Sequence, residues 1–221
     1  RILSSLIIIP LVFFFLYLGS SFFILFLCIL FLVSLNEWIK MNIKNNLIKF
    51  IGIIFLFFSF YSAYLIRNDF GFNIILFVIL ICVFTDLGGY FFGKIFRGPK
   101  LTNISPNKTY SGVLGSFVIS FIGLIIFINY QHNIDQFQIN EINNNLVLNL
   151  FGYNFKTFLF VLIISLISQI GDLAISYFKR KAKIKDTGKI LPGHGGLLDR
   201  IDGMIFVFPS SYVIFSIEIL K

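Results

Sequence analysis

The chain has 221 residues, of which 57% are hydrophobic and only 13% are charged, and its mean hydropathy is +0.92. An ordinary soluble domain has roughly 25% charged and 45–50% apolar residues. These values exclude a soluble globular domain, a disordered chain and a disulfide-rich secreted module, because no water-soluble core of this size buries so many large apolar side chains. The composition therefore predicts an all-α integral membrane protein, a helical bundle with several spans.

The net charge of +8 does not indicate nucleic-acid binding, because basic residues of membrane proteins usually lie in cytoplasmic loops. There they set the topology and contact anionic lipid head groups. The two cysteines, Cys28 and Cys82, lie inside apolar runs. Their positions predict neither a disulfide framework nor a metal site.

Seven apolar stretches approach the roughly 20 residues that a membrane-spanning helix needs. The first two are short and meet at Gly19-Ser20-Ser21, which fits either a tight hairpin or one long or re-entrant segment. No soluble domain is inserted between the stretches, so about seven spans are expected. The predicted spans are residues 2–18, 21–35, 47–66, 72–92, 111–130, 155–178 and 203–220.

Lysine and arginine residues are distributed along the chain in a way that predicts its topology. Arg1 and the segments 36–49, 93–110 and 179–202 contain 15 of the 18 basic residues. The positive-inside rule places these segments, and the N-terminus with them, in the cytoplasm. Residues 131–153 are then expected on the far side of the membrane.

The same topology brings four aspartates to the cytoplasmic ends of their spans, next to the most basic loops. Acidic side chains in this position can reach cytosolic nucleotides or metal ions. The four are Asp86, Asp172, Asp199 and Asp202.

Asp86 lies within a predicted span, in the run TDLGGYFFGK at residues 85–94. An ionisable side chain inside a span is costly and is a functional candidate by default. The alternative is that Asp86 neutralises a nearby lysine while Gly89 and Gly93 let two helices approach closely. This segment alone leaves both interpretations open.

The segment that begins the fifth predicted span, SPNKTYSG at residues 105–112, is a second candidate. A helix start offers free backbone N–H groups, and Lys108 adds a positive charge, which together suit a phosphate. The alternative is a Ser/Thr helix cap with proline punctuation. By itself the segment favours the cap.

A polar face is predicted on the sixth span. Asp172, Ser176, Lys179 and Arg180 follow one another at helical spacing and so share one face. A carboxylate deep in a span, aligned with two cations at its end, suits a metal with phosphates beside it. The alternative is that the cations only mark the membrane boundary, which explains Lys179 and Arg180 but not Asp172.

The densest polar segment, residues 185–202, reads KDTGKILPGHGGLLDRID. Its glycines let the backbone approach a ligand closely, as in phosphate-binding loops. Asp199 and Asp202 stand three residues apart on one helix face and suit a hard cation such as Mg²⁺. The alternative is a glycine turn followed by acids that complement a helix N-terminus.

The stretch from Ser176 to Asp202 resembles, without a gap, the signature of phosphatidate cytidylyltransferases, also called CDP-diacylglycerol synthases. The run around Asp86 and residues 105–109 also resemble segments of that family, so the resemblance covers most of the C-terminal two-thirds. Two positions depart from it, because Ser111 and Ile175 stand where the family often has Glu.

The resemblance implies transfer of the cytidylyl group of CTP to phosphatidic acid, giving CDP-diacylglycerol and pyrophosphate in phospholipid biosynthesis. It implies Mg²⁺ as the cofactor, with K⁺ as a candidate second cation. It also implies a multi-pass protein of the cell's inner (plasma) membrane whose site faces the cytoplasm, with the bilayer but no nucleic acid as a partner, and it leaves a homodimer open. Residues 1–221 are expected to form a single domain, in which 1–84 are N-terminal spans and 85–221 are catalytic spans and loops.

On this basis the site residues fall into three groups. The predicted metal ligands are Asp172, Asp199 and Asp202, with Asp86 as an additional candidate. The predicted catalytic residues are Asp172, Lys185, Asp186, His194 and Asp199; His194, by itself a polar loop residue or a general base, is interpreted here as a phosphate contact. The residues predicted to bind substrate or phosphate are Ser105, Lys108, Thr109, Lys179, Arg180, Gly195, Gly196 and Arg200.

Two other functions fit part of the pattern. A transporter or ion pathway built around Asp86 and Asp172 explains the intramembrane acids but not the long polar loop. A CDP-alcohol phosphotransferase also acts on lipid phosphates, but its usual Asp-Gly-x2-Ala-Arg string is absent from the sequence.

Overall fold

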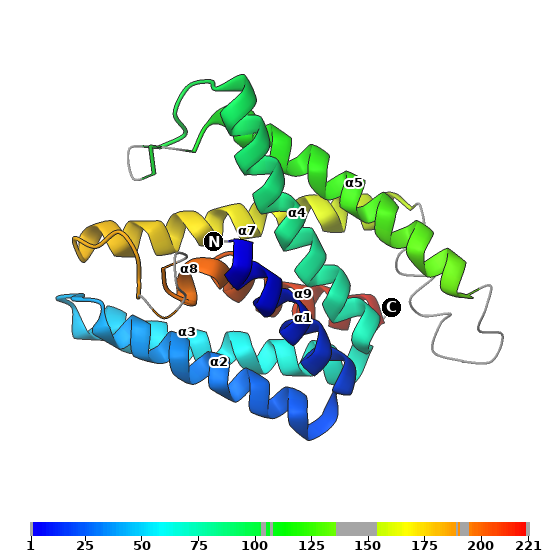
Figure 1. The fold of residues 1–221 in the computed structure, drawn as a ribbon, viewed down its shortest axis with the longest axis horizontal. Helices are drawn as coiled ribbons and strands as arrows, with labels where there is room; N and C mark the ends of the chain where they lie inside the picture. The colour runs from blue at the N-terminus through cyan, green and yellow to red at the C-terminus, as the bar shows by residue number, and fades with distance from the viewer. Residues whose placement is uncertain are drawn as a thin grey trace. The chain divides into compact units, whose positions relative to one another are not determined.

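The computed structural model of the chain describes residues 2–102, 105, 106, 108–135, 154–188, 190 and 195–219. Regular structure in these residues is helical, apart from isolated bridge positions such as the pair Lys100 and Thr109, and the all-α prediction is confirmed. Figure 1 shows the helices, which are α1 (Ile2–Leu18), α2 (Ser20–Lys40), α3 (Asn46–Leu65), a short π-helix (Ile66–Phe70), α4 (Phe72–Phe96), α5 (Tyr110–Asp135), α7 (Phe155–Lys181), α8 (Leu198–Ile201) and α9 (Met204–Ile219).

Five of the described helices are long and apolar enough to cross a membrane, namely α2, α3 with the π-helix, α4, α5 and α7. Helix α9 contains a shorter apolar stretch, Met204–Ile217, and α1 has 17 residues. Each predicted span thus coincides with a helix, and the chain is a polytopic membrane protein. In hydrocarbon every backbone N–H and C=O must be bonded within its own segment, which favours helices in such apolar runs. Phe50 and Phe57 remain 62% and 61% exposed, as side chains that face lipid do.

The end of α2 differs from the prediction. The predicted span ends at residue 35, where polar residues begin, but α2 continues to Lys40. Trp38 provides the reason: it is 3% exposed, its ring centroid lies 5.3 Å from that of Phe178, and its Nε1 donates to the Lys49 carbonyl at 3.0 Å. These contacts keep the last turn of α2 packed and carry Glu37 into the interior.

The junction between α1 and α2 is a hairpin. Gly19 adopts φ +60°, a left-handed conformation that glycine reaches without steric cost. Beside this turn Phe15 stacks on Phe26 with ring centroids 4.9 Å apart. The hairpin prediction is confirmed and the alternative of one long segment is wrong, while a re-entrant course through the membrane stays a prediction.

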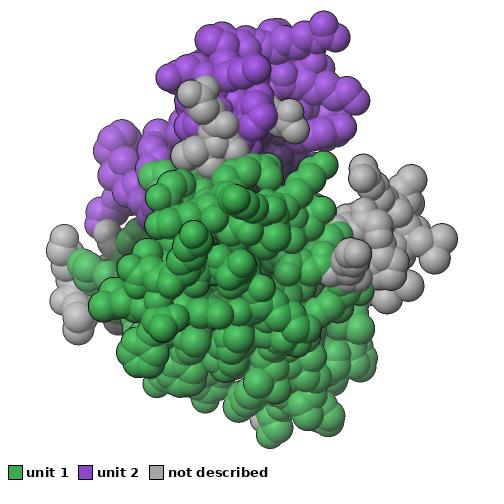
Figure 2. All heavy atoms as spheres, turned by 90° about the vertical axis from the view of Figure 1, so that its left-hand side faces the viewer, with its two compact units in different colours: residues 1–75, 170–221 green, residues 76–169 purple. Residues whose placement is uncertain are grey.

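The chain forms two compact units, Arg1–Ile75 with Ile170–Lys221 and Leu76–Gln169, which Figure 2 shows in separate colours. In the first unit α3 packs against both α2 and α9, and α1 packs against α2. An apolar cluster joins α2, α3, α7 and α9 to α8. Its buried members are Trp38, Met41, Ile43, Leu56, Phe60, Ile175, Ala182, Leu198 and Ile205.

In the second unit α4 and α5 approach one another through glycine. A Cβ atom added to Gly112 would lie 2.9 Å from the Gly89 carbonyl oxygen, and one added to Gly88 would lie 2.8 Å from Cα of Ser116. Ser116 also donates from Oγ to the Thr85 carbonyl at 2.8 Å. The prediction that the glycines near Asp86 allow close helix packing is confirmed for Gly89.

Within the first unit the arrangement of loops agrees with the predicted alternation. The basic segments that follow α2 and α7 lie at the same end of the unit (Figure 1), where Trp38 meets Phe178. The other end holds the α1–α2 turn and the π-helix, where Arg67 donates from Nε to the Leu16 carbonyl at 3.2 Å.

We expect cysteines at positions 44 and 183 to react from the cytoplasmic side and one at position 68 from the opposite side, because lysine-rich loops stay inside. The native Lys44, Lys183 and Asn68 side chains are all exposed. The measurement is maleimide labelling of sealed vesicles from each side, after Cys28 and Cys82 have been changed to serine. Labelling of Lys183→Cys from outside only would reverse the proposed orientation.

Candidate functional site

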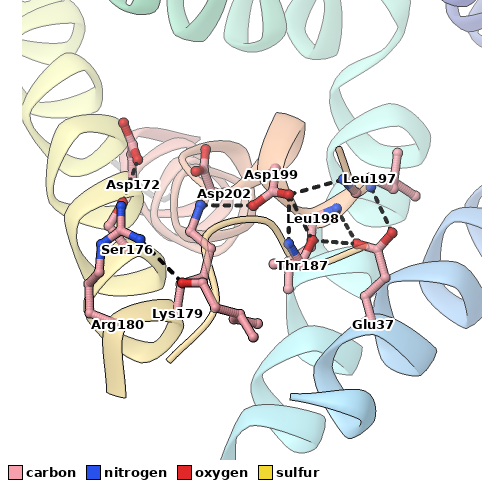
Figure 3. A network of polar contacts seen from close by, with 12 residues as sticks. Glu37, Asp172, Ser176, Lys179, Arg180, Thr187, Leu197, Leu198, Asp199 and Asp202 are labelled. Atoms are coloured by element: carbon pink, nitrogen blue, oxygen red, sulfur yellow. Dashed lines mark hydrogen bonds and ion pairs between the residues drawn. The ribbon is translucent and has the colours of Figure 1, made fainter. Parts of the chain in front are cut away.

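Polar side chains gather where the end of α2, the end of α7 and the short helix α8 meet within the first unit (Figure 3). Two buried carboxylates, Glu37 and Asp199, are the main acceptors. A lysine, a threonine and backbone N–H groups of the loop before α8 are the donors.

The Asp199 carboxylate has four hydrogen-bond donors within reach, and it shares one of them, the Thr187 hydroxyl, with Glu37. Lys179 donates from Nζ to Oδ1 at 2.8 Å, while the Thr187 N–H, the Thr187 hydroxyl and the Gly196 N–H donate to Oδ2 at 2.8, 3.1 and 3.0 Å. The side chains of Lys179 and Asp199 are only 11% and 6% exposed. Asp199 therefore forms a buried ion pair that ties the loop to the end of α7.

The environment of Asp199 favours its ionised form. Burial alone raises the pKa of this carboxyl, but the hydrogen bonds from Lys179, Thr187 and Gly196, with the charge of Lys179, outweigh burial and lower the pKa below its ordinary value. Because the pKa is lower in the folded chain, the ionised carboxylate stabilises the fold above its ordinary pKa of about 4. That contribution is lost as the pH falls below this range.

Glu37 is the second buried acceptor, with 2% of its surface exposed. Its Oε1 accepts from the Leu197 N–H at 2.9 Å. Its Oε2 accepts from the Leu198 N–H at 2.9 Å and from the Thr187 hydroxyl at 2.8 Å. Helix α2 thereby holds the loop that leads into α8.

Glu37 and Thr187 were not among the predicted site residues. A signal for Glu37 was present, because it is an acid next to a long apolar run, which is the same feature that identified Asp86. It was overlooked because the predicted span ends at residue 35, which assigns Glu37 to a solvated loop.

The predicted polar face of α7 is present in part. Ser176 donates from Oγ to Asp172 Oδ1 at 3.3 Å, as their spacing of one helical turn predicts. Lys179 instead turns toward Asp199, and the exposed Arg180 donates from Nη1 to the Ile184 carbonyl at 3.2 Å. Both cations thus have acceptors within the protein.

Asp202 lies beside the Asp172 segment. It is 8% exposed, and its Oδ1 accepts from the Gly203 N–H at 2.9 Å, just before α9 begins. A Cβ atom added to Gly171 would lie 3.0 Å from the Asp202 carbonyl oxygen, so α7 passes close to this turn. Figure 3 shows the carboxylates of Asp172 and Asp202 pointing to the same side.

The donor set fits a magnesium ion held in part by substrate. Mg²⁺ prefers oxygen ligands and is usually bound by one or two carboxylates together with substrate phosphates. Asp172, Asp199 and Asp202 are carboxylates of this kind. Both oxygens of Asp199 accept hydrogen bonds, and one oxygen each of Asp172 and Asp202 does so as well. Among the residues that the structure describes, no group of three or more His, Cys, Asp or Glu side chains is placed to hold a metal ion. A fully protein-built metal cage is therefore not seen in this part of the chain.

The glycines before α8 lie against the protein's own side chains. Gly195 has φ +84°, and a Cβ atom there would lie 3.0 Å from Asp199 Oδ2. A Cβ atom on Gly196 would collide with the Thr187 hydroxyl and with Glu37. The loop can follow this path because these positions carry no side chain.

Four other predicted residues are placed as follows. Lys185, Asp186 and Arg200 are exposed. The first two precede the buried Asp199 in the sequence and Arg200 follows it directly. His194 lies outside the described residues.

The remaining substrate-binding candidates lie in the second unit. Thr109 accepts at Oγ1 from the Gly112 N–H at 3.1 Å, so the helix-cap interpretation is confirmed for Thr109. The Ser111 hydroxyl lies 2.9 Å from that of Thr109. Lys108 and Ser105 are half-buried in the preceding turn, where the Lys108 N–H donates to the Ser105 carbonyl at 3.0 Å.

Two more positions bear on the resemblance. Asp86 is exposed on α4. Ile175, which stands where the family often has Glu, is 3% exposed and belongs to the apolar cluster of the first unit. An apolar residue is therefore well accommodated at that position.

Fold and site together define a polytopic helical membrane protein with a buried lysine–aspartate pair and further carboxylates beside a glycine-containing loop. The chain belongs to the cytidylyltransferase family, whose profile matches residues 43–218. The matched segment includes α3 to α8 and most of α9.

Known relatives agree with this membership. The chain is 38% identical over 163 residues to a phosphatidate cytidylyltransferase of Staphylococcus haemolyticus, which covers 73% of this chain and 54% of the relative. It is 39% identical over 166 residues to that of Staphylococcus aureus strain COL, with the same coverage. For the phosphatidate cytidylyltransferase of Brucella suis the identity is 38% over 157 residues, covering 70% and 52%. The chain thus spans about half the length of the curated relatives it matches.

Proposed function

We propose that the chain transfers the cytidylyl group of CTP to phosphatidic acid and releases CDP-diacylglycerol and pyrophosphate. Three relatives named phosphatidate cytidylyltransferase, at 38–39% identity, support this substrate pair. The structural observation that carries the proposal is the Lys179–Asp199 pair, which holds a glycine-containing loop next to further carboxylates and exposed cations. A diacyl substrate stays in the bilayer, since each buried CH₂ contributes about 0.8 kcal/mol, and this matches an enzyme built of membrane helices.

The reaction requires neutralisation of phosphate charge and alignment of the attacking and leaving oxygens more than it requires a strong base. An oxygen of the lipid phosphate, already anionic near neutral pH, attacks the α-phosphorus of CTP. The bond from that phosphorus to the bridging oxygen breaks, and pyrophosphate leaves in line with the attacking oxygen. We propose that Arg180, Lys185, His194 and Arg200 contact the phosphates. For Lys108, which belongs to the second unit, a phosphate contact is proposed separately.

Asp172 and Asp202 are the residues proposed to hold Mg²⁺, with substrate phosphates as further ligands. When bound, Mg²⁺ neutralises phosphate charge and polarises the α-phosphate. Asp199, paired with Lys179, orients the loop, and its assignment as a further metal ligand remains a prediction. K⁺ as a second cation, Asp86 as an additional ligand and Asp186 as a catalytic acid remain predictions.

We further propose that the site faces the cytoplasm at the plasma membrane, because CTP is cytosolic and the loops beside the site are basic. Bacterial relatives support this location. A homodimer remains a prediction.

The proposal is tested by incubating membranes that contain the chain with radiolabelled phosphatidate and CTP, dCTP or ATP. We expect labelled CDP-diacylglycerol with CTP and little nucleotidyl transfer with ATP. If a correctly inserted chain forms no CTP-dependent product, the proposal is rejected, and the transporter alternative becomes the preferred explanation of the intramembrane aspartates.

Lys108→Ala tests the phosphate contact in the second unit. A charged hydrogen bond contributes about 1.5–3 kcal/mol, so we expect turnover to fall roughly 10- to 150-fold. Insertion and purification should be normal, because Thr109 and not Lys108 caps α5. Lys100→Ala, at an exposed lysine of the same loop that is not among the predicted site residues, is the control. Activity of Lys108→Ala within about twofold of the parent would support the helix-cap interpretation of this segment.

A further inference from the structure

We propose that Glu37 is a positioning residue for cytidylyl transfer, which fixes the loop before α8, and through it Asp199, from a helix end outside the family-matching segment 43–218. This inference rests on the proposed function. Glu37 does not touch substrate in this assignment. It acts through the backbone of Leu197 and Leu198 and through the side chain of Thr187.

The burial of Glu37 is the first argument. A carboxylate that is 2% exposed carries a large desolvation cost unless its oxygens are hydrogen-bonded. In the described part of the chain its partners are two backbone N–H groups and one hydroxyl, all uncharged. Both amides belong to consecutive residues, Leu197 and Leu198, so the two oxygens of one carboxylate determine where α8 begins.

A shared hydroxyl couples Glu37 to Asp199. The Thr187 Oγ1 lies 2.8 Å from Glu37 Oε2 and 3.1 Å from Asp199 Oδ2. A hydroxyl has one hydrogen to donate, so the two carboxylates compete for it. A displacement of Glu37 therefore changes the hydrogen bond that Asp199 accepts from the Thr187 hydroxyl. Figure 3 shows Thr187 between Glu37 and Asp199.

Two glycines of the loop lie so close to Glu37 that a side chain at either position would not fit. A Cβ atom on Gly188 would lie 2.6 Å from Glu37 Oε1, and one on Gly196 would lie 2.5 Å from Oε2. The backbone on both sides of the loop thus closes around this carboxylate. If Glu37 only filled space, neither the two hydrogen bonds from backbone amides nor the absence of side chains at Gly188 and Gly196 would be needed.

Glu37→Gln tests the inference because it keeps the size of the side chain and removes one acceptor. Whichever way the amide is oriented, its NH₂ group faces a donor, so the N–H of Leu197 or Leu198 loses its acceptor. We expect hydrogen exchange at that amide to accelerate about tenfold or more, the effect of losing a hydrogen bond to a charged group. We expect kcat per folded protein to fall about tenfold as well, whereas a merely structural role would lower the folded fraction and leave this kcat unchanged.

Thr187→Val is the second variant, because it removes the shared hydroxyl and keeps the N–H that donates to Asp199. It should lower kcat while amide exchange at Leu197 and Leu198 stays near the parent rate. Ser34→Ala is the matched control, since Ser34 is fully buried one turn earlier on α2 and donates to the Leu30 carbonyl of its own helix. It should change neither measurement by more than about twofold.

The outcomes separate this inference from the proposed function. Unchanged amide exchange in Glu37→Gln, or parent-like kcat in both variants, would overturn the positioning role. A parent protein without CTP-dependent turnover would refute the proposed function, and the exchange measurement would still report whether Glu37 holds the loop.

Discussion

Asp172→Asn should lower CTP-dependent turnover by about 100- to 1000-fold, the range seen when one preorganised electrostatic group is removed from an active site. Asparagine keeps the shape and one oxygen of aspartate but loses the charge that attracts a cation. Its Oδ1 still accepts from the Ser176 hydroxyl, the bond that Asp172 makes at 3.3 Å. We therefore expect the thermal unfolding midpoint in detergent to move little, while radiolabelled CDP-diacylglycerol formation is nearly abolished.

Asp69→Asn is the matched control for this change. Asp69 is exposed at the opposite end of the first unit and accepts from the Tyr212 hydroxyl at 3.2 Å. It should keep parent-like turnover. In addition, a chelator should abolish the parent's activity and Mg²⁺ should restore it. An active Asp172→Asn protein, or substantial turnover without metal, would remove Asp172 from the proposed cation site.

Lys179→Met should lower the free energy of unfolding by about 3–5 kcal/mol, because removing one partner of a buried ion pair leaves the other charge uncompensated. Lys179 Nζ lies 2.8 Å from Asp199 Oδ1, with both side chains largely buried. Methionine has a similar length but no charge, so the loss reports the pair and not a cavity. Unfolding is measured by circular dichroism in mixed micelles of a mild detergent and sodium dodecyl sulfate.

Lys181→Met is the control, since Lys181 is exposed and lies 5.8 Å from the centre of the Tyr177 ring. Such an exposed cation–π contact contributes only about 0.5–1 kcal/mol. The double variant Lys179→Met, Asp199→Asn should be more stable than Lys179→Met alone, because asparagine still accepts from the loop amides and no charge is left unpaired. Equal stability of Lys179→Met and Lys181→Met would contradict a buried ion pair.

Asp172 and Asp199, which the sequence presents as equivalent metal ligands, differ in the structure. Asp199 has its charge matched by Lys179 and its second oxygen occupied by Thr187 and Gly196. Asp199→Asn should therefore reduce stability as well as activity, whereas Asp172→Asn should reduce activity alone. Sequence spacing could not separate them, because both stand at span ends next to basic residues.

Local regularities were predictable from the sequence. Apolar runs of about 20 residues predict helices because a lipid environment leaves the backbone no other partner, and each of the seven runs coincides with a helix. The one-turn spacing of Asp172 and Ser176 correctly predicts their contact. The resemblance of residues 176–202 to cytidylyltransferases agrees with the family that matches residues 43–218.

Contacts between distant segments were decided only by the tertiary structure. Helical spacing places Lys179 on the Asp172 face of α7, yet its long side chain turns to Asp199 on another segment, where burial strengthens the attraction between opposite charges. Glu37 meets residues 150 to 161 positions further along the chain, and no periodicity in the sequence carries that information. Composition and spacing thus determined the membrane helices and the candidate aspartates, and the resemblance of residues 176–202 indicated the family. Packing of α2 against the loop and α8 determined which carboxylate pairs with lysine and which one holds the loop, because those choices depend on buried hydrogen bonds that form only after the helices have come together.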